Sequence, residues 1–153
     1  MFMNKIRVLL KLDQHTLLLF IEAFIYLAIA RLLLLRPFMK IAPSLGARTE
    51  VTPEICEDKQ VQRQLKKIAS AIDIMSRNTF WESKCFVRAI ACMKMLKRRN
   101  ISSTIYLGTG KDEHGKLIAH AWLRSGPIYL SGAEVMKEFV VVETFASKAS
   151  FTA

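Results

Sequence analysis

The fold depends on one stretch of the sequence, which reads Phe80-Trp81-Glu82-Ser83-Lys84-Cys85-Phe86-Val87-Arg88-Ala89-Ile90-Ala91. Ser83 is a typical helix N-cap residue, because its hydroxyl can accept a hydrogen bond from an amide of the first turn. Cys85 would then lie among unpaired backbone N–H groups at the positive end of the helix dipole, which favours the thiolate over the thiol. The sequence therefore predicts a helix from about Ser83 to Arg99 with a reactive cysteine in its first turn.

The composition is that of a single globular domain. The chain has 153 residues, of which 52% are hydrophobic, so it can bury a sizeable core. Its three cysteines, Cys56, Cys85 and Cys92, lack the paired spacing of a disulfide scaffold, which favours a reducing, cytoplasmic compartment. The sequence has neither the Cys/His spacing of a zinc site nor a glycine-rich Walker loop, so we expect no metal and no cofactor.

The formal charge of +10 suggests an anionic partner, but the basic residues are spread along the chain. They are not accompanied by a nucleic-acid fold signature or by base-stacking aromatic residues, so we expect no nucleic-acid partner. Most of this charge is explained by solvated helix faces. If the charge binds a partner, an acidic peptide or an anionic membrane surface suits it better.

The N-terminal part of the chain is its most apolar segment. Residues 16–35 have the length of a membrane span but contain Glu22 and Arg31, and Pro37 follows them. We predict a long helix that is buried against the domain or against a partner, with a membrane-surface helix as the alternative. Residues 41–52 resemble a linker, so the expected organisation is an N-terminal helix with its linker (1–50) and a core (51–153).

The remaining pattern predicts an α+β domain. Thr52-Pro53-Glu54 is typical of a helix start, and an apolar stripe at helical spacing continues to Met75. After the helix that carries Cys85, the period changes to that of strands, which we expect at 104–107, 117–124, 128–131 and 139–143. Helices followed by a mostly antiparallel sheet define the α+β class.

The second residue that could carry chemistry is His120, in the strand Leu117-Ile118-Ala119-His120-Ala121-Trp122-Leu123-Arg124. Alternation places His120 and Trp122 on one face, and Ala119, Ala121 and Leu123 on the other. The small alanines would let a helix pack closely over the strand. A helix carrying Cys85 could then bring sulfur to imidazole, although a structural histidine and a buried structural cysteine are the other interpretations.

Several segments together resemble one family. They are Trp81-x-x-x-Cys85 at a helix start, Lys97-Arg98-Arg99-Asn100-Ile101, a strand ending in Gly108, and Ala119-His120-Ala121-Trp122. In this combination the chain resembles the lasso-peptide maturation peptidases, which are bacterial leader peptidases of the transglutaminase-like superfamily. The similarity covers about residues 60–146. It implies a transglutaminase-like (papain-like) cysteine peptidase core.

The resemblance also implies a role for each site residue. Cys85 would be the nucleophile, and His120 the base that keeps it ionised and later protonates the leaving amine. The backbone N–H of Cys85 would help to stabilise the oxyanion. The family completes its triad with an acid on the strand after the histidine, but here that strand, Ile128-Tyr129-Leu130-Ser131, has no carboxylate.

Four groups remain as candidates to orient His120. Ser131 is favoured by geometry, because a hairpin around Gly126 would place it roughly opposite His120. Glu134 is favoured by its chemistry, and a backbone carbonyl or Glu143 are further options. Those carboxylates that do not contact the imidazole are expected to be solvated surface charges.

The implied substrate is a ribosomally made precursor peptide, cleaved between leader and core before an ATP-using lasso cyclase closes the ring. The chain is similar to the stand-alone form of the peptidase, which relies on a separate leader-binding protein. Residues 17–35 are the candidate docking surface. The alternatives are another Cys–His acyl transfer, of transglutaminase or deamidase type, and a non-catalytic scaffold of the maturation complex.

Overall fold

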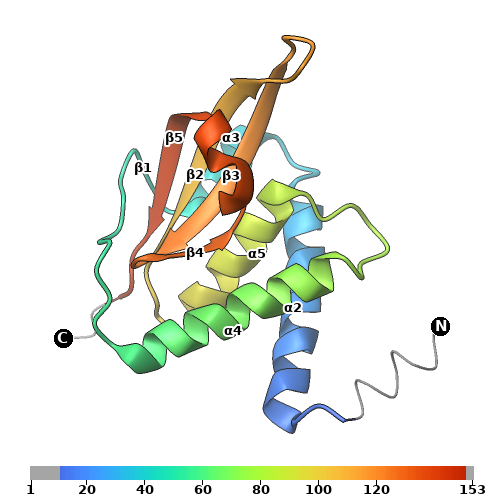
Figure 1. The fold of residues 1–153 in the computed structure, drawn as a ribbon, viewed down its shortest axis with the longest axis vertical. Coiled ribbons are helices and arrows are strands. Elements are labelled where there is room, and N and C mark those ends of the chain that lie inside the picture. Colours follow the sequence, from blue (N-terminus) through green and yellow to red (C-terminus); the bar gives the residue numbers. More distant parts are fainter. Residues whose placement is uncertain (1–10, 151–153) are drawn as a thin grey trace.

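The computed structural model describes residues 11–150, and it confirms the predicted α+β class (Figure 1). The helices are α2 (Gln14–Leu33), α3 (Phe38–Leu45), α4 (Lys59–Ser76), α5 (Cys85–Arg98) and the 3₁₀ helix η1 (Ala133–Glu138). The strands are β1 (Ala47–Arg48), β2 (Ser103–Lys111), β3 (Leu117–Ser125), β4 (Ile128–Ser131) and β5 (Val140–Ser147).

The strands form one antiparallel sheet with the order β1-β5-β2-β3-β4. Strand alternation gives the sheet two different faces, as the sequence predicts. Ala121 and Leu123 of β3 belong to the hydrophobic core that the helices share. Trp122 points to the other face, where its ring stacks on that of Tyr106 with the centroids 5.7 Å apart.

Helix α5 is the centre of the core. Eight of its 14 residues are buried, and they lie on all sides of the helix from Val87 to Leu96. Its small residues, among them Ala89 and Ala91, let neighbouring elements approach closely. α5 packs on β3 and β2, while α2 and α4 pack on α5.

Helix α2 contributes to the same core. Its N-cap is Asp13, whose carboxylate accepts a hydrogen bond from the Thr16 N–H at 3.0 Å. Ala23, Leu27 and Ala30 are fully buried against α4 and α5, so the predicted boundary at residue 50 separates two parts of one core. The first ten residues of the predicted N-terminal segment lie outside the described residues. α2 is also long and apolar enough to cross a membrane, by length and composition only.

Two of the local predictions need correction. The helix expected to start at Thr52 begins instead at Lys59, where the Asp58 side chain caps the first turn. Thr52 is held in an irregular segment, because its N–H donates to the Thr104 hydroxyl and its carbonyl accepts from the buried Arg124 guanidinium. The expected linker at 41–52 contains most of α3 and also β1, which pairs with β5.

An ion pair joins α2 to the end of α5. Both carboxylate oxygens of Glu22 accept hydrogen bonds from the Arg99 guanidinium, at 2.7 and 2.6 Å, and Arg98 lies 3.3 Å away. Burial acts to raise the pKa of Glu22, but the hydrogen bonds and positive charges of Arg99 and Arg98 outweigh it and hold that pKa below its ordinary value. The one carboxylate within α2 is therefore satisfied by the protein itself.

Glu22→Gln is expected to destabilise the fold at neutral pH by about 1.5–3 kcal/mol, because it removes a charged hydrogen-bond acceptor from a largely buried pair. A lowered folded-state pKa means that the carboxylate stabilises the fold above its ordinary value of 4.5, and that this stability is lost as the pH falls through the folded value. Urea unfolding at several pH values should show the difference between variant and wild type shrinking below pH 4.5. Glu113→Gln, in the exposed β2–β3 turn, is the control, and a difference that does not depend on pH would contradict the assignment.

Candidate active site

Cys85 is the first residue of α5, in the position that the sequence predicts. The residue before the helix is not the cap we expected, however. Lys84 occupies the N-cap position without a side-chain hydrogen bond, and the Ser83 hydroxyl is instead 2.9 Å from the Thr79 hydroxyl. Because no side chain of residues 11–150 caps this end, the N–H groups of the first turn remain available to an anion beside the Cys85 thiol.

The loop before Cys85 is anchored to α2 and to itself. The ring of Trp81 packs on that of Phe24, with the centroids 5.1 Å apart. The Thr79 hydroxyl donates to the Trp81 carbonyl at 2.8 Å, which tightens the turn that leads into α5. α2 therefore supports the approach to the candidate nucleophile, in addition to its place in the core.

His120 lies on β3, opposite Gly108 of β2. Its imidazole packs between two rings, with centroids 5.8 Å from Trp122 and 4.9 Å from Phe139. Nε2 is 2.7 Å from the backbone carbonyl oxygen of Gly132. Because a carbonyl oxygen can only accept, Nε2 carries a proton, and the neutral ring has its lone pair on Nδ1.

The observed register between β3 and β4 shows that the prediction for Ser131 is wrong. Ser131 is opposite Leu123 rather than His120, because the hairpin pairs Ser125 with Ile128, and a register shift between Leu123 and Arg124 moves Ser131 one residue further from His120. Its hydroxyl oxygen is buried and has no hydrogen-bond partner among residues 11–150. Ser131 therefore does not orient the imidazole.

The two carboxylates are engaged elsewhere. The Glu134 side chain is 68% exposed and lies 4.0 Å from the guanidinium of Arg88, which is on the first turn of α5. Glu143 forms an ion pair with Arg48, and the hydrogen bond from Arg48 holds the pKa of Glu143 below its ordinary value. Of the four candidate groups, the backbone carbonyl is the one that contacts His120.

The position of that carbonyl depends on Gly132, which sequence reasoning missed. Gly132 has a φ of +73°, a conformation that L side chains rarely adopt. A Cβ atom there would lie 2.4 Å from the Ala121 carbonyl oxygen and 3.1 Å from His120 Nε2. A glycine directly after a strand was the only sequence signal, and it is typical of any turn.

Cys85 and His120 lie on two elements that pack against each other, α5 and β3, but their side chains are not joined by a hydrogen bond. α5 packs on the face of β3 that carries Ala121 and Leu123, whereas His120 extends from the other face. Among residues 11–150, no hydrogen bond joins the Cys85 thiol to the imidazole. η1 links the two elements: it follows Gly132, whose carbonyl binds His120, and Glu134 in η1 lies 4.0 Å from the Arg88 guanidinium of α5.

Neither Cys92 nor any group of metal-ligating side chains forms a second candidate site among residues 11–150. Cys92 is fully buried, which raises the pKa of its thiol to about 12 although the charge of Arg88 opposes this. Within the part of the chain that the structure describes, no three His, Cys, Asp or Glu side chains are grouped so that they could hold a metal ion.

A cysteine that opens a buried helix, followed by an antiparallel sheet with an oriented histidine, is an arrangement compatible with cysteine-based acyl transfer. Residues 23–144 match the model of the transglutaminase-like superfamily, so the chain belongs to this superfamily, whose members are usually cysteine-based enzymes. No curated protein matches the chain, and no solved structure does.

Gly132→Ala should displace the carbonyl from His120 and lower any Cys85-dependent activity by about 100-fold, because a small misplacement of a catalytic group costs that much. Gly115→Ala is the matched control, because Gly115 has a φ of +74° but no atom within 4 Å of the added Cβ. Thermal unfolding of both variants measures the shared backbone strain. Equal activity of the two variants would show that the Gly132 carbonyl has no orienting role.

The cysteines should differ in reactivity. In a Cys56→Ser background at pH 7.5, iodoacetamide should modify Cys85, while Cys92 stays unmodified because its thiol is buried and protonated. His120→Ala should slow the modification of Cys85 if the imidazole takes up the thiol proton. Mass spectrometry of tryptic peptides measures both rates, and equally slow modification of Cys85 and Cys92 would indicate an inert structural thiol.

Proposed function

We propose that the chain is a cysteine peptidase that removes the leader from a ribosomally made lasso precursor peptide. The observation that carries this proposal is a cysteine in the first turn of a buried helix together with a histidine whose ring is fixed on the adjoining strand. Membership of the transglutaminase-like superfamily supports cysteine chemistry. The choice of a lasso precursor rests on the resemblance around Cys85 and Ala119-His120-Ala121-Trp122.

In this mechanism, Nδ1 of His120 takes the proton of the Cys85 thiol, and the thiolate attacks the carbonyl carbon of the scissile peptide bond. The first-turn N–H groups of α5, including that of Cys85, stabilise the oxyanion. The imidazolium protonates the leaving amine as the C–N bond breaks, which leaves a thioester on Cys85. Water then attacks the thioester, His120 accepts its proton, and the leader leaves with a new carboxylate while the thiol is restored.

The Gly132 carbonyl takes the orienting position that an acid occupies in the family. It fixes the Nε2–H tautomer and so leaves Nδ1 as the base. Being neutral, it stabilises the imidazolium less than a carboxylate would. In the structure the imidazole extends from the face of β3 opposite α5, so this proton transfer requires the segment of β3 that carries His120 to move toward Cys85 when substrate binds.

The proposed setting follows from this substrate. We place the protein in the cytoplasm, where a leader-binding protein would deliver the precursor and a lasso cyclase would use the liberated core peptide. Tethering by the leader-binding protein would raise the effective concentration of a weakly bound substrate. The proposal involves no nucleic acid and no cofactor, and any membrane association would be through α2.

Cys85→Ala should abolish leader removal, with a loss on the order of 10⁴–10⁶-fold, because the nucleophile is removed. The measurement is the intact mass of the cognate precursor after incubation with the leader-binding protein and either wild type or variant. Cys56→Ser is the matched control and should cleave normally. Equal cleavage by wild type and Cys85→Ala would show that Cys85 is not the nucleophile.

The same assay separates the alternatives. Release of ammonia without a new terminus would favour deamidation or transglutaminase-type crosslinking. The absence of any mass change with wild type, once binding of the leader-binding protein is verified, would favour a scaffold. The lack of a thiol–imidazole hydrogen bond among residues 11–150 is the observation that favours this second candidate.

A further inference from the structure

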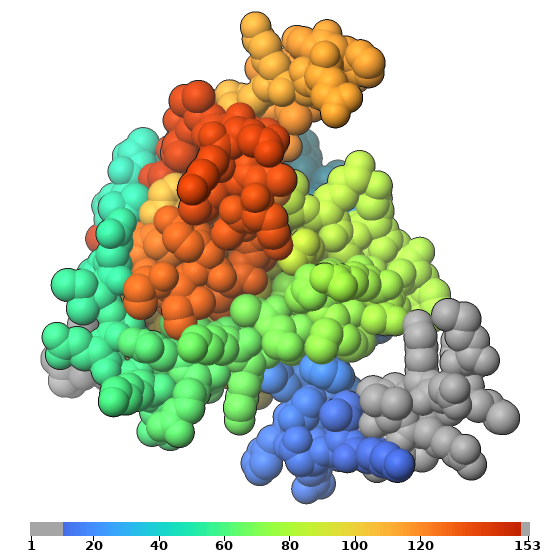
Figure 2. Space-filling model, in the orientation of Figure 1, coloured from blue at the N-terminus to red at the C-terminus, as the bar shows by residue number. Residues whose placement is uncertain are grey.

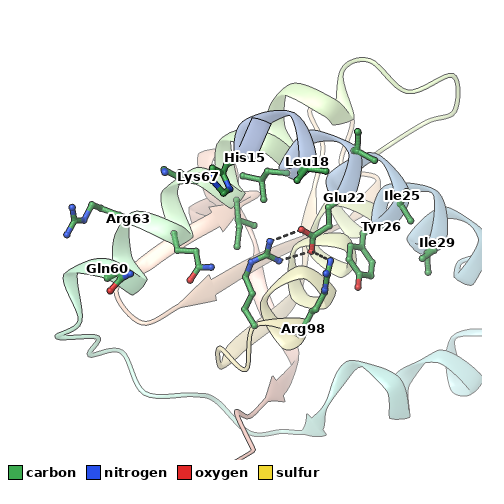
Figure 3. A pocket seen from close by; sticks show the side chains of 15 residues that line it. His15, Leu18, Glu22, Ile25, Tyr26, Ile29, Gln60, Arg63, Lys67 and Arg98 are labelled. Atoms are coloured by element: carbon green, nitrogen blue, oxygen red, sulfur yellow. Dashed lines mark hydrogen bonds and ion pairs between the residues drawn. The ribbon is translucent and has the colours of Figure 1, made fainter. Parts of the chain in front are cut away.

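A groove runs between α2, α4 and the C-terminal end of α5 (Figure 3). In Figure 2 the surface is hollowed between the blue residues of α2 and the green residues of α4. The groove lies beside Arg98 and Arg99, at the opposite end of α5 from Cys85. It is therefore separate from the candidate active site.

One wall of the groove is an apolar stripe on α2. Leu18, Ile21, Ile25 and Ile29 follow one another at spacings of three and four, so they share one face of the helix. Their exposed fractions are 58%, 48%, 50% and 37%, respectively. The opposite face of α2 is buried in the core. A helix that is apolar all round is normally covered on both sides, so this stripe requires an apolar partner.

The other wall is polar and basic. Gln60, Arg63, Gln64 and Lys67 line it from one face of α4. Neither Arg63 nor Lys67 has a carboxylate within ion-pair distance among residues 11–150. Glu22 is the one carboxylate that lines the groove, and it is neutralised by Arg98 and Arg99. The groove therefore has uncompensated positive charge facing an apolar wall.

From these two walls we infer that the groove binds an acidic amphipathic helix of a partner protein. Leucine-like side chains of that helix would pack on the α2 stripe, and its carboxylates would pair with Arg63 and Lys67. The span from Leu18 to Ile29 is about 17 Å, or three helical turns at 1.5 Å per residue. This inference is independent of the proposed peptidase activity.

Two other occupants fit less well. A second copy of this chain has the same charge of +10, so pairing two basic grooves would be repulsive. A flat membrane surface would contact the outer edge of the α2 stripe. The cations Arg63 and Lys67 lie on α4, across the groove from that stripe, so a flat surface would not contact both. A narrow acidic and apolar segment contacts both walls at once.

The test uses the full-length protein and a fluorescent synthetic helix of about 14 residues, with leucines at i, i+3, i+4 and i+7 and glutamates beside them. Fluorescence anisotropy should show saturable binding, and a matched peptide with lysine in place of each glutamate should bind at least tenfold more weakly. The double variant Arg63→Glu/Lys67→Glu and the variant Ile25→Asn should each weaken binding at least tenfold. Lys111→Glu/Lys116→Glu, in the distant β2–β3 turn, should leave binding unchanged.

Circular dichroism verifies that each variant is folded. Equal binding of the two peptides, or full binding by Arg63→Glu/Lys67→Glu, would overturn the inference. Binding to phosphatidylglycerol-containing vesicles without binding to the acidic peptide would assign the surface to a membrane instead. Self-association through Ile25 in analytical ultracentrifugation would assign it to a second copy. None of these results depends on whether the protein cleaves a precursor.

Discussion

The burial of α5 is the constraint on which the rest of the structure depends. The helix contacts the sheet on one side and α2 and α4 on the others, so it can neither rotate nor slide without exposing apolar residues. Its first residue, Cys85, is therefore fixed relative to the core-facing side chains of β3. The Glu22–Arg99 pair fixes the other end of α5 to α2. A cysteine carried on a loop would not be positioned so firmly.

Periodicity was sufficient to predict the long helices α2 and α5, the strands β2 to β5 and the division of β3 into two faces, but not the short elements α3, β1 and η1. The alternation around His120 and the apolar run of α5 are local signals, and the structure has them as predicted. The irregular segment at Thr52 could not be predicted, because contacts with Thr104 and Arg124, distant in sequence, override a favourable local helix start. Ser83 likewise lost its expected cap role to a competing hydrogen bond with Thr79.

The candidate site was harder to predict than the fold. Cys85 and His120 carry side-chain chemistry that can be read from the sequence, but the group that holds His120 belongs to the main chain. Ser131 was favoured because a hairpin around Gly126 would bring it roughly opposite His120, but the observed turn pairs Ser125 with Ile128 and a register shift at Leu123 moves Ser131 further away. The groove beside α2 also needed the structure, because its basic wall comes from α4 and its apolar wall from a helix about 40 residues earlier.

The use of a main-chain acceptor for His120 has a consequence for how this site can change over evolution. A triad acid can be lost by one codon change that leaves the backbone intact. A peptide carbonyl is present whatever residue occupies position 132, so substitution there acts through shape alone: φ is +73° and the space for a Cβ atom is already filled. Selection at this position is therefore expected to act on the absence of a side chain. Searches that look only for a catalytic acid would overlook proteins built in this way.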